Sequence, residues 1–283
     1  MPWIEPVSAT IKTASLAATL AKESSFIKRL YARFIYWKDH GCACIPIFGS
    51  SGVGKTTASK ILLNGVVECN NSSYQMSTDD EVCILNGNIP GKIVVVPGQI
   101  SDFEYNWKHH INDIVNGKCF GLINIVSYGY HSFCLETFKD HDLYKKDMSV
   151  DDFVDVYTEH RRNHEIDLLK KICTPLKTLQ SRIWFITIIN KQDLWWDKKA
   201  LVRKHYYDGV YNSIISDLKD EIGGGLLQHI FAPVSFEINN WTTGNNERLA
   251  NTVVGYDNTI QLRHIFPLFR SFSQFLARGK GND

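Results

Sequence analysis

Four residues at fixed spacing, Gly49, Gly54, Lys55 and Thr56, carry the clearest chemical signal in the chain. They fit the pattern G-x-x-x-x-G-K-[ST], in which glycines let the backbone turn so that successive N–H groups converge on phosphate oxygens. The lysine brings positive charge to the β- and γ-phosphates, and the hydroxyl after it is a ligand for Mg²⁺. We therefore predict a phosphate-binding loop made of Gly49, Ser50, Ser51, Gly52, Val53, Gly54, Lys55, Thr56 and Thr57.

The segments around this loop are those needed to position it. The apolar run CACIPIF before it is typical of a strand, and ASKILLNGVVE after it is typical of a helix whose positive N-terminal end points at the anion. Strand-like and helix-like segments alternate from Gly41 onward, which predicts an α/β fold of the P-loop NTPase type, with a mostly parallel sheet of about six strands flanked by helices. The expected strands are 42–48, 81–85, 92–96, 119–128, 182–190 and 229–238, and the expected helices are 55–68, 101–115, 151–180, 198–221 and 259–278.

We expect a helical extension over residues 1–40 before a nucleotide-binding domain over residues 41–283. Residues 8–38 are basic and amphipathic; contact with a membrane is an alternative for them, but packing on the domain is favoured. The segment at about 130–165 is longer than a crossover helix needs, so we expect an insertion before the fifth strand that carries partner specificity. Its His and Asp residues lack a paired ligand spacing, which favours a solvated loop over a metal site.

Composition limits the classes of function. With 283 residues, 44% of them hydrophobic, the chain can bury a full core without a metal or disulfide. A net charge of +1 gives no overall basic field, so nucleic acid is not a favoured ligand. Its 7 cysteines have no repeated spacing and indicate reduced thiols. Because neither a membrane span nor a signal peptide is recognisable, we expect a cytoplasmic protein.

A second motif follows the buried strand pattern RIWFITII, as Asn190, Lys191, Gln192 and Asp193. Ligands of open α/β sheets lie beyond the carboxyl ends of the strands, so this motif and the phosphate loop would face the same crevice. An aspartate accepts two parallel hydrogen bonds, which fits the N1–H and exocyclic amine of guanine and mismatches adenine. Asn190 would brace the loop, and the stem of Lys191 would cover one face of the base. The alternative is a helix-start turn capped by Asp193.

The two motifs in this order resemble the Ras-like GTPase family over about residues 42–278. The resemblance implies a switch protein that binds GTP and GDP with Mg²⁺ and hydrolyses GTP to GDP and phosphate. It also implies a protein effector or activating protein as a partner. In the family, a late Ser-Ala-like turn offers a backbone N–H to the guanine carbonyl. Val234-Ser235-Phe236 matches this turn loosely, which assigns Ser235 and Phe236 to the base subsite.

One metal-holding residue of the family has no counterpart. The strand before the second switch normally ends in Asp-x-x-Gly, and KIVVVPGQ places Val95 where the Asp should be. Val-Pro-Gly-Gln without that Asp is similar to the bacterial Ras-like polarity GTPases of the gliding-motility type. The resemblance implies that the Gly98 N–H meets the γ-phosphate and that Gln99 positions the attacking water. A surface glutamine that caps the next helix is the alternative for Gln99.

The resemblance assigns the remaining roles as follows. Thr78, in the first switch segment, is the candidate for a second Mg²⁺ ligand beside Thr56. Gln99 and Lys55 are the catalytic residues. No arginine is assigned, so hydrolysis is expected to be slow until a partner binds; Arg161 and Arg162 are candidates, although a charged helical face is favoured for both. Two alternatives remain: a GTP-binding interaction protein with little hydrolysis, and an ATP-dependent phosphotransferase, which the aspartate of the second motif opposes.

Overall fold

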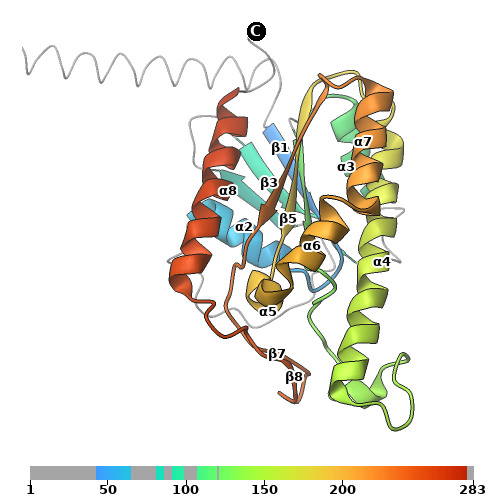
Figure 1. The fold of residues 1–283 in the computed structure, drawn as a ribbon. Coiled ribbons are helices and arrows are strands. Elements are labelled where there is room, and N and C mark those ends of the chain that lie inside the picture. The colour runs from blue at the N-terminus through green and yellow to red at the C-terminus, as the bar shows by residue number, and fades with distance from the viewer. Residues whose placement is uncertain (1–42, 65–80, 86–90, 99–106, 120, 279–283) are drawn as a thin grey trace, which may run out of the picture.

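The computed structural model describes residues 43–64, 81–85, 91–98, 107–119 and 121–278. Several expectations lie outside these ranges: the helical extension over residues 1–40, the start of the helix expected at residue 101, and the switch residues Thr78 and Gln99. Among the described residues, the structure has one main sheet with helices on both faces (Figure 1).

The main sheet has six strands in the order β2-β3-β1-β4-β5-β6. The strand β2 pairs antiparallel with β3 at one edge, and the other neighbouring pairs are parallel. This confirms the expected α/β fold with a mostly parallel sheet. The strands are β1 (Ala43–Phe48), β2 (Glu81–Leu85), β3 (Gly91–Val95), β4 (Gly121–Val126), β5 (Ile183–Ile189) and β6 (Leu227–Pro233).

Side chains that alternate along β1 divide the core into two layers. Ile45 and Ile47 pack in the cluster shared with α2 and α8, whereas Cys44 and Phe48 pack in the cluster shared with α3, α4, α6 and α7. Figure 1 shows these two groups of helices on opposite faces of the sheet. The helices are α2 (Lys55–Asn64), α3 (Lys108–Val115), α4 (Val150–Leu176), α5 (Gln192–Trp195), α6 (Lys199–Tyr206), α7 (Val210–Ile222) and α8 (Asn258–Arg278).

Pro46 lies within β1, which has a neighbour on each side. Toward β3 the ladder continues through it, with Pro46 opposite Val94. Toward β4 the register changes, because Cys44 lies opposite Cys119 while Ile47 lies opposite Ile123. This one-residue irregularity spans the position where proline offers no N–H, so an interior strand tolerates it.

Two predicted elements differ from the observed ones. The single helix expected over 198–221 is two helices, α6 and α7, with Gly209 between them. A Cβ at Gly209 would lie 2.6 Å from the His205 carbonyl oxygen, so this tight turn requires glycine. The strand expected over 229–238 ends at Pro233, and an unpredicted hairpin follows, made of β7 (Trp241–Thr242) and β8 (Arg248–Ala250). Strands this short leave no alternating apolar pattern to detect.

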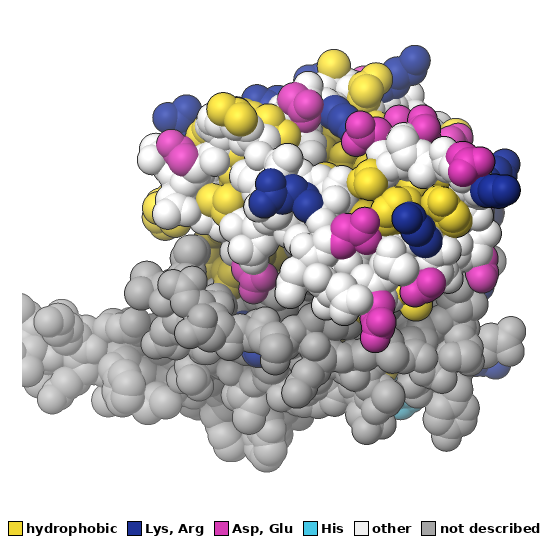
Figure 2. All heavy atoms as spheres, turned by 90° about the horizontal axis from the view of Figure 1, so that it is seen from below, with side chains coloured by type: hydrophobic (Ala, Val, Ile, Leu, Met, Phe, Trp, Pro, Cys, Tyr) yellow, Lys and Arg dark blue, Asp and Glu magenta, His cyan; other side chains and the backbone are white. Residues whose placement is uncertain are grey.

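The described surface mixes charges of both signs. Figure 2 views the molecule from below and shows Lys and Arg side chains interspersed with Asp and Glu on the described part of that face. Within the described ranges, no helix is both long enough and apolar enough to cross a membrane.

Candidate functional site

The phosphate loop lies between the end of β1 and the start of α2. Gly49, Gly52 and Gly54 have φ angles of +141°, +79° and +94°, a region that residues with a Cβ rarely adopt. A Cβ would lie 2.4 Å from the Ile125 carbonyl oxygen at Gly49, and 2.6 Å from the Ser132 nitrogen at Gly52. The loop is therefore wrapped closely against neighbouring backbone, and the predicted glycines make that approach possible.

Lys55 and Gly98 face each other across the loop. The buried Lys55 donates from Nζ to the carbonyl oxygens of Gly49 and Ser50, both at 3.0 Å. The Ser51 N–H donates to the Gly98 carbonyl oxygen at 3.2 Å, and a Cβ on Gly98 would lie 2.5 Å from Lys55 Nζ. The structure thus brings the segment after β3 against the predicted phosphate loop.

Asn190 connects the phosphate loop to the loop that follows β6. Its Nδ2 donates to the Val53 carbonyl oxygen at 2.8 Å, and its Oδ1 accepts the Phe236 N–H at 3.1 Å. Its own carbonyl accepts from Trp195 Nε1 at 2.9 Å. The structure therefore places Asn190 where it braces the phosphate loop. A backbone N–H of the 234–236 turn was expected to face a guanine carbonyl, and the one at Phe236 donates to Asn190 in this structure.

Asp193 is buried, and its carboxylate already has partners on its own chain. Oδ1 accepts from Ser235 Oγ, and Oδ2 accepts from the Asn239 N–H at 3.2 Å and from Thr252 Oγ1 at 3.3 Å. Burial raises the pKa of Asp193, against the opposing effect of the bonds from Ser235 and Asn239. The N-cap position of α5 is Lys191, whose side chain makes no capping bond, and Asp193 lies in the first turn, so the capping interpretation does not describe this carboxylate.

Lys191 occupies the left-handed region, with φ +58°, at the turn between β5 and α5. Its Nζ lies 3.4 Å from Ser132 Oγ. Burial lowers the pKa of Lys191 to about 8, while the carboxylates of Asp193 and Glu237 act in the opposite direction. Its stem therefore runs inside the cleft beside the aspartate of the same motif.

A cleft of about 1220 Å³ joins these parts, a volume larger than that of most small-ligand pockets. The phosphate loop, Gly98, Lys191, Asp193 and Phe236 all line it. Asn190 also lines the cleft, and Ser235 contributes through its bond to Asp193. Most of the other lining residues were not predicted. They come from the loop after β4 and from the segment around the β7–β8 hairpin, and include Ser132, Phe133, Cys134, Glu237, Asn239, Asn240, Trp241, Thr242, Thr243, Gly244 and Asn246.

The described residues fit a phosphate group better than a protein-held metal. Val95, at the position where the sequence pattern of Ras-like GTPases has an Asp, is 2% exposed and packs in the core beside Ile47 and Val53. No cluster of three or more His, Cys, Asp or Glu side chains able to hold a metal occurs within the described ranges. The donor that fits Mg²⁺ there is Thr56 at the start of α2, so the ion's remaining ligands would be phosphate oxygens, water and residues beyond the described part.

The expected insertion packs as part of the core. Phe133 and Phe138 are buried, and His141 lies between the rings of Phe133, Phe153 and Tyr157. The expectation of a solvated loop is therefore wrong at His131, which is buried, whereas Asp140 and Asp142 are exposed. Arg161 and Arg162 lie 5.0 Å and 4.7 Å from the ring centres of Tyr157 and Tyr128, so both guanidinium groups rest on aromatic faces.

His131, within that segment, forms a buried pair with Glu165 of α4. His131 Nε2 lies 2.9 Å from Glu165 Oε1, and both side chains are buried. Burial lowers the pKa of His131 to about 4, although the bond to Glu165 opposes this change. Burial also opposes the charge of Glu165, but hydrogen bonds from His131, Tyr206 and Ser127 outweigh it and lower the pKa of that carboxyl. The pair is thus a neutral imidazole donating to a carboxylate.

This pair predicts loss of stability in mild acid. His131 takes up a proton near pH 6.5 in the unfolded chain but only near pH 4 in the folded chain. The contribution of His131 to the free energy of unfolding is therefore complete above about pH 6.5 and is lost as the pH falls toward 4. We expect His131 to remove about 2 kcal/mol from the free energy of unfolding between pH 7.5 and pH 5. Urea unfolding at both values checks this, and a His131→Asn variant should show a smaller difference; equal differences would contradict the assignment.

Comparison with known proteins leaves the family open. No protein-family model matches the sequence, and no curated protein matches it. Among solved structures, the fold is similar to a chain described as "The Structure of the Mammalian SRP Receptor", with 12% sequence identity and a TM-score of 0.43. The match covers 82% of this chain and 99% of that chain.

Proposed function

We propose that this protein is a guanine-nucleotide-binding switch that hydrolyses GTP to GDP and phosphate. The observation that carries the proposal is the hydrogen bond between Asn190 and Val53, which joins the predicted base motif to the phosphate loop at 2.8 Å. Asp193 lines the same cleft as the loop and is oriented by Ser235. A ligand with a phosphate chain at one end and a base with two adjacent donors at the other suits this pair of subsites.

In the proposed function, Lys55 would neutralise phosphate charge, and Gly98 and Gln99 would position the γ-phosphate and the attacking water. Lys55 would exchange its two loop carbonyls for phosphate oxygens, since a charge-assisted bond to an anion is stronger than a bond to a neutral carbonyl. The Ser51 N–H would move from the Gly98 carbonyl oxygen to a phosphate oxygen, and the Gly98 N–H would donate to the γ-phosphate. This exchange would make the segment after β3 sensitive to the nucleotide state. When bound, Mg²⁺ would neutralise developing charge on the phosphates. Gln99 would orient the attacking water.

The buried Val95 favours a second candidate, a GTP-binding protein with little hydrolysis. A valine side chain has no oxygen to offer a metal, and this one is 2% exposed in the core. Transition-state charge would therefore be stabilised by Lys55 and by groups beyond the described residues. In that case the bound nucleotide is read by a partner protein and is not turned over.

Hydrolysis of GTP and ATP by the purified chain with Mg²⁺ separates the candidates. We expect slow turnover of GTP, none of ATP, and a loss of about 10²-fold in Gln99→Ala, because a misplaced water costs about that factor. Nucleotide binding should be unchanged in this variant, which serves as the control for folding. Tight binding of GTP without turnover would establish the second candidate, and equal use of ATP would contradict the assignment of Asp193.

A further inference from the structure

We propose that Glu165, on α4 and away from the predicted nucleotide contacts, is a positioning residue for the phosphate loop. It acts through the loop after β4, whose residues 127–132 connect that strand to the wall of the cleft. The proposal rests on the proposed function only for the identity of the ligand. The mechanical link from Glu165 to the phosphate loop is a property of the fold.

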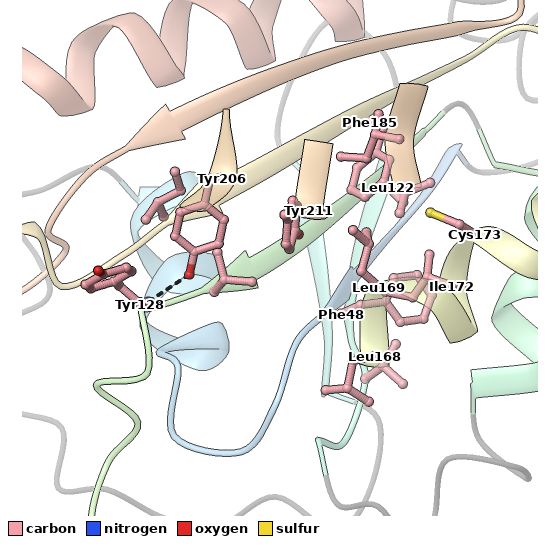
Figure 3. Close-up of a cluster of buried hydrophobic side chains, with 14 of the residues drawn as sticks. Phe48, Leu122, Tyr128, Leu168, Leu169, Ile172, Cys173, Phe185, Tyr206 and Tyr211 are labelled. Atoms are coloured by element: carbon pink, nitrogen blue, oxygen red, sulfur yellow. Dashed lines mark hydrogen bonds between the residues drawn. The ribbon is translucent and has the colours of Figure 1, made fainter. Parts of the chain in front are cut away.

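The first step of the link is the set of hydrogen bonds between Glu165 and the loop after β4. Its Oε1 accepts the backbone N–H of Ser127 at 2.9 Å and of Gly129 at 3.4 Å, and it lies 2.9 Å from His131 Nε2. Its Oε2 accepts from the Tyr206 hydroxyl at 2.6 Å, and the oxygen of that hydroxyl accepts the Tyr128 N–H at 2.9 Å. Figure 3 shows the last contact at the edge of the buried cluster. A single carboxylate thus sets the path of this loop.

The conformation of this loop depends on its hydrogen bonds to Glu165. Gly129 has a φ of +83°, and a Cβ there would lie 2.2 Å from the Thr158 carbonyl oxygen of α4. Glu165 is 2% exposed, and Ser127 and Gly129 are buried, so solvent does not reach these two N–H groups to replace the carboxylate. Losing Glu165 would leave buried donors unpaired, so the loop would shift to regain partners.

The second step passes from Ser132 to the phosphate loop. The N–H of Ser132 donates to the Gly52 carbonyl oxygen at 2.9 Å, and Ser132 Oγ donates to the same oxygen at 3.1 Å. Ser132 Oγ also lies 3.4 Å from Lys191 Nζ, in the base motif. Ser132 therefore ties Gly52 to Lys191, and its own place is fixed by the neighbouring His131 on Glu165.

Two readouts test the link, and one of them needs no nucleotide. The N–H groups of Ser51 and Ala58 donate to the carbonyl oxygens of Gly98 and Gly54, so their amide hydrogen exchange reports the rigidity of the phosphate loop. Calorimetric titration with inorganic pyrophosphate and GDP reports the affinity of the loop for phosphate groups. In Glu165→Leu we expect exchange at least about tenfold faster and pyrophosphate affinity about tenfold weaker, the size of an unpaired buried donor. Glu165→Gln keeps an acceptor oxygen in place and should stay within about threefold of the wild type.

Two further variants guard against a general loss of stability. Ser132→Ala removes the side-chain contacts to Gly52 and Lys191 and should speed exchange in the phosphate loop without lowering the melting temperature. Tyr211→Phe deprives Asn124 Nδ2 of its partner at 2.8 Å, outside the loop after β4, and should leave the phosphate loop unchanged. Wild-type exchange in both Glu165→Leu and Ser132→Ala, or equally fast exchange in Tyr211→Phe, would overturn the proposal. Faster exchange in a protein that binds no GDP would uphold it and reject the proposed ligand.

Discussion

Asp193→Asn should lower the affinity for GDP by about 10²- to 10³-fold, the value of two hydrogen bonds to a charged acceptor. An asparagine amide presents one acceptor and one donor, and the donor faces the exocyclic amine of guanine. Xanthine carries a carbonyl in place of that amine and is complementary to the amide. Xanthosine diphosphate should therefore bind the variant more tightly than GDP does, as measured by competition titration. Unchanged GDP affinity would show that Asp193 bonds only to residues of the protein and does not contact the base.

The contacts of Asp193 supply the matched control. A carboxylate has about four lone-pair sites, and Ser235, Asn239 and Thr252 take at least three of them. Guanine brings two donors, so one partner at Oδ2 has to leave when the base binds. Thr252→Val removes the hydroxyl that competes there and should raise GDP affinity about threefold or more. A weaker affinity in Thr252→Val would mean that this hydroxyl supports the base subsite.

Lys55→Ala should weaken GDP binding by about 10²-fold or more, because the variant loses the charge that neutralises the phosphates. The binding of guanosine, which has no phosphate, should be unchanged. The comparison of the two ligands by titration therefore separates a loss of phosphate binding from a loss of fold.

Lys60→Ala is the matched control for that change. Lys60 lies on the same helix and lines the same cleft, but its side chain is exposed. Exposed charges contribute little because solvent screens them, so this variant should bind GDP within about threefold of the wild type. Equal losses in both lysine variants would indicate a diffuse electrostatic effect in place of a specific phosphate contact.

Much of the fold could be predicted because its signals are local. The glycines and lysine of the phosphate loop lie within nine residues, and the buried strands are short apolar runs between turn residues. The helices expected over 151–180 and 259–278 match α4 and α8 closely. By contrast, the break between α6 and α7 depends on Gly209 meeting the backbone of His205, and the β7–β8 hairpin depends on contacts and not on pattern.

The hairpin shows why part of the cleft was missed. Trp241 is buried, and its Nε1 donates to the His131 carbonyl oxygen at 2.9 Å. The Gly244 N–H donates to the Leu135 carbonyl oxygen at 2.8 Å. These partners lie more than a hundred residues earlier in the chain. Neither residue of such a contact belongs to a periodic pattern or a motif with fixed spacing. The part of the cleft wall that these contacts form therefore could not be predicted from the sequence.

The sequence alone determined that this chain has a phosphate loop after a buried strand and an Asn-Lys-Gln-Asp turn after another, because each motif is set by the backbone demands of adjacent residues. The tertiary structure decided how they act together. Asn190 forms a hydrogen bond with Val53, which lies 137 positions earlier in the chain. Glu165 holds the loop that contacts Gly52, and Asn239 and Thr252 donate hydrogen bonds to the carboxylate of Asp193. These contacts follow from strand order and packing, which bring distant residues together at the carboxyl edge of the sheet.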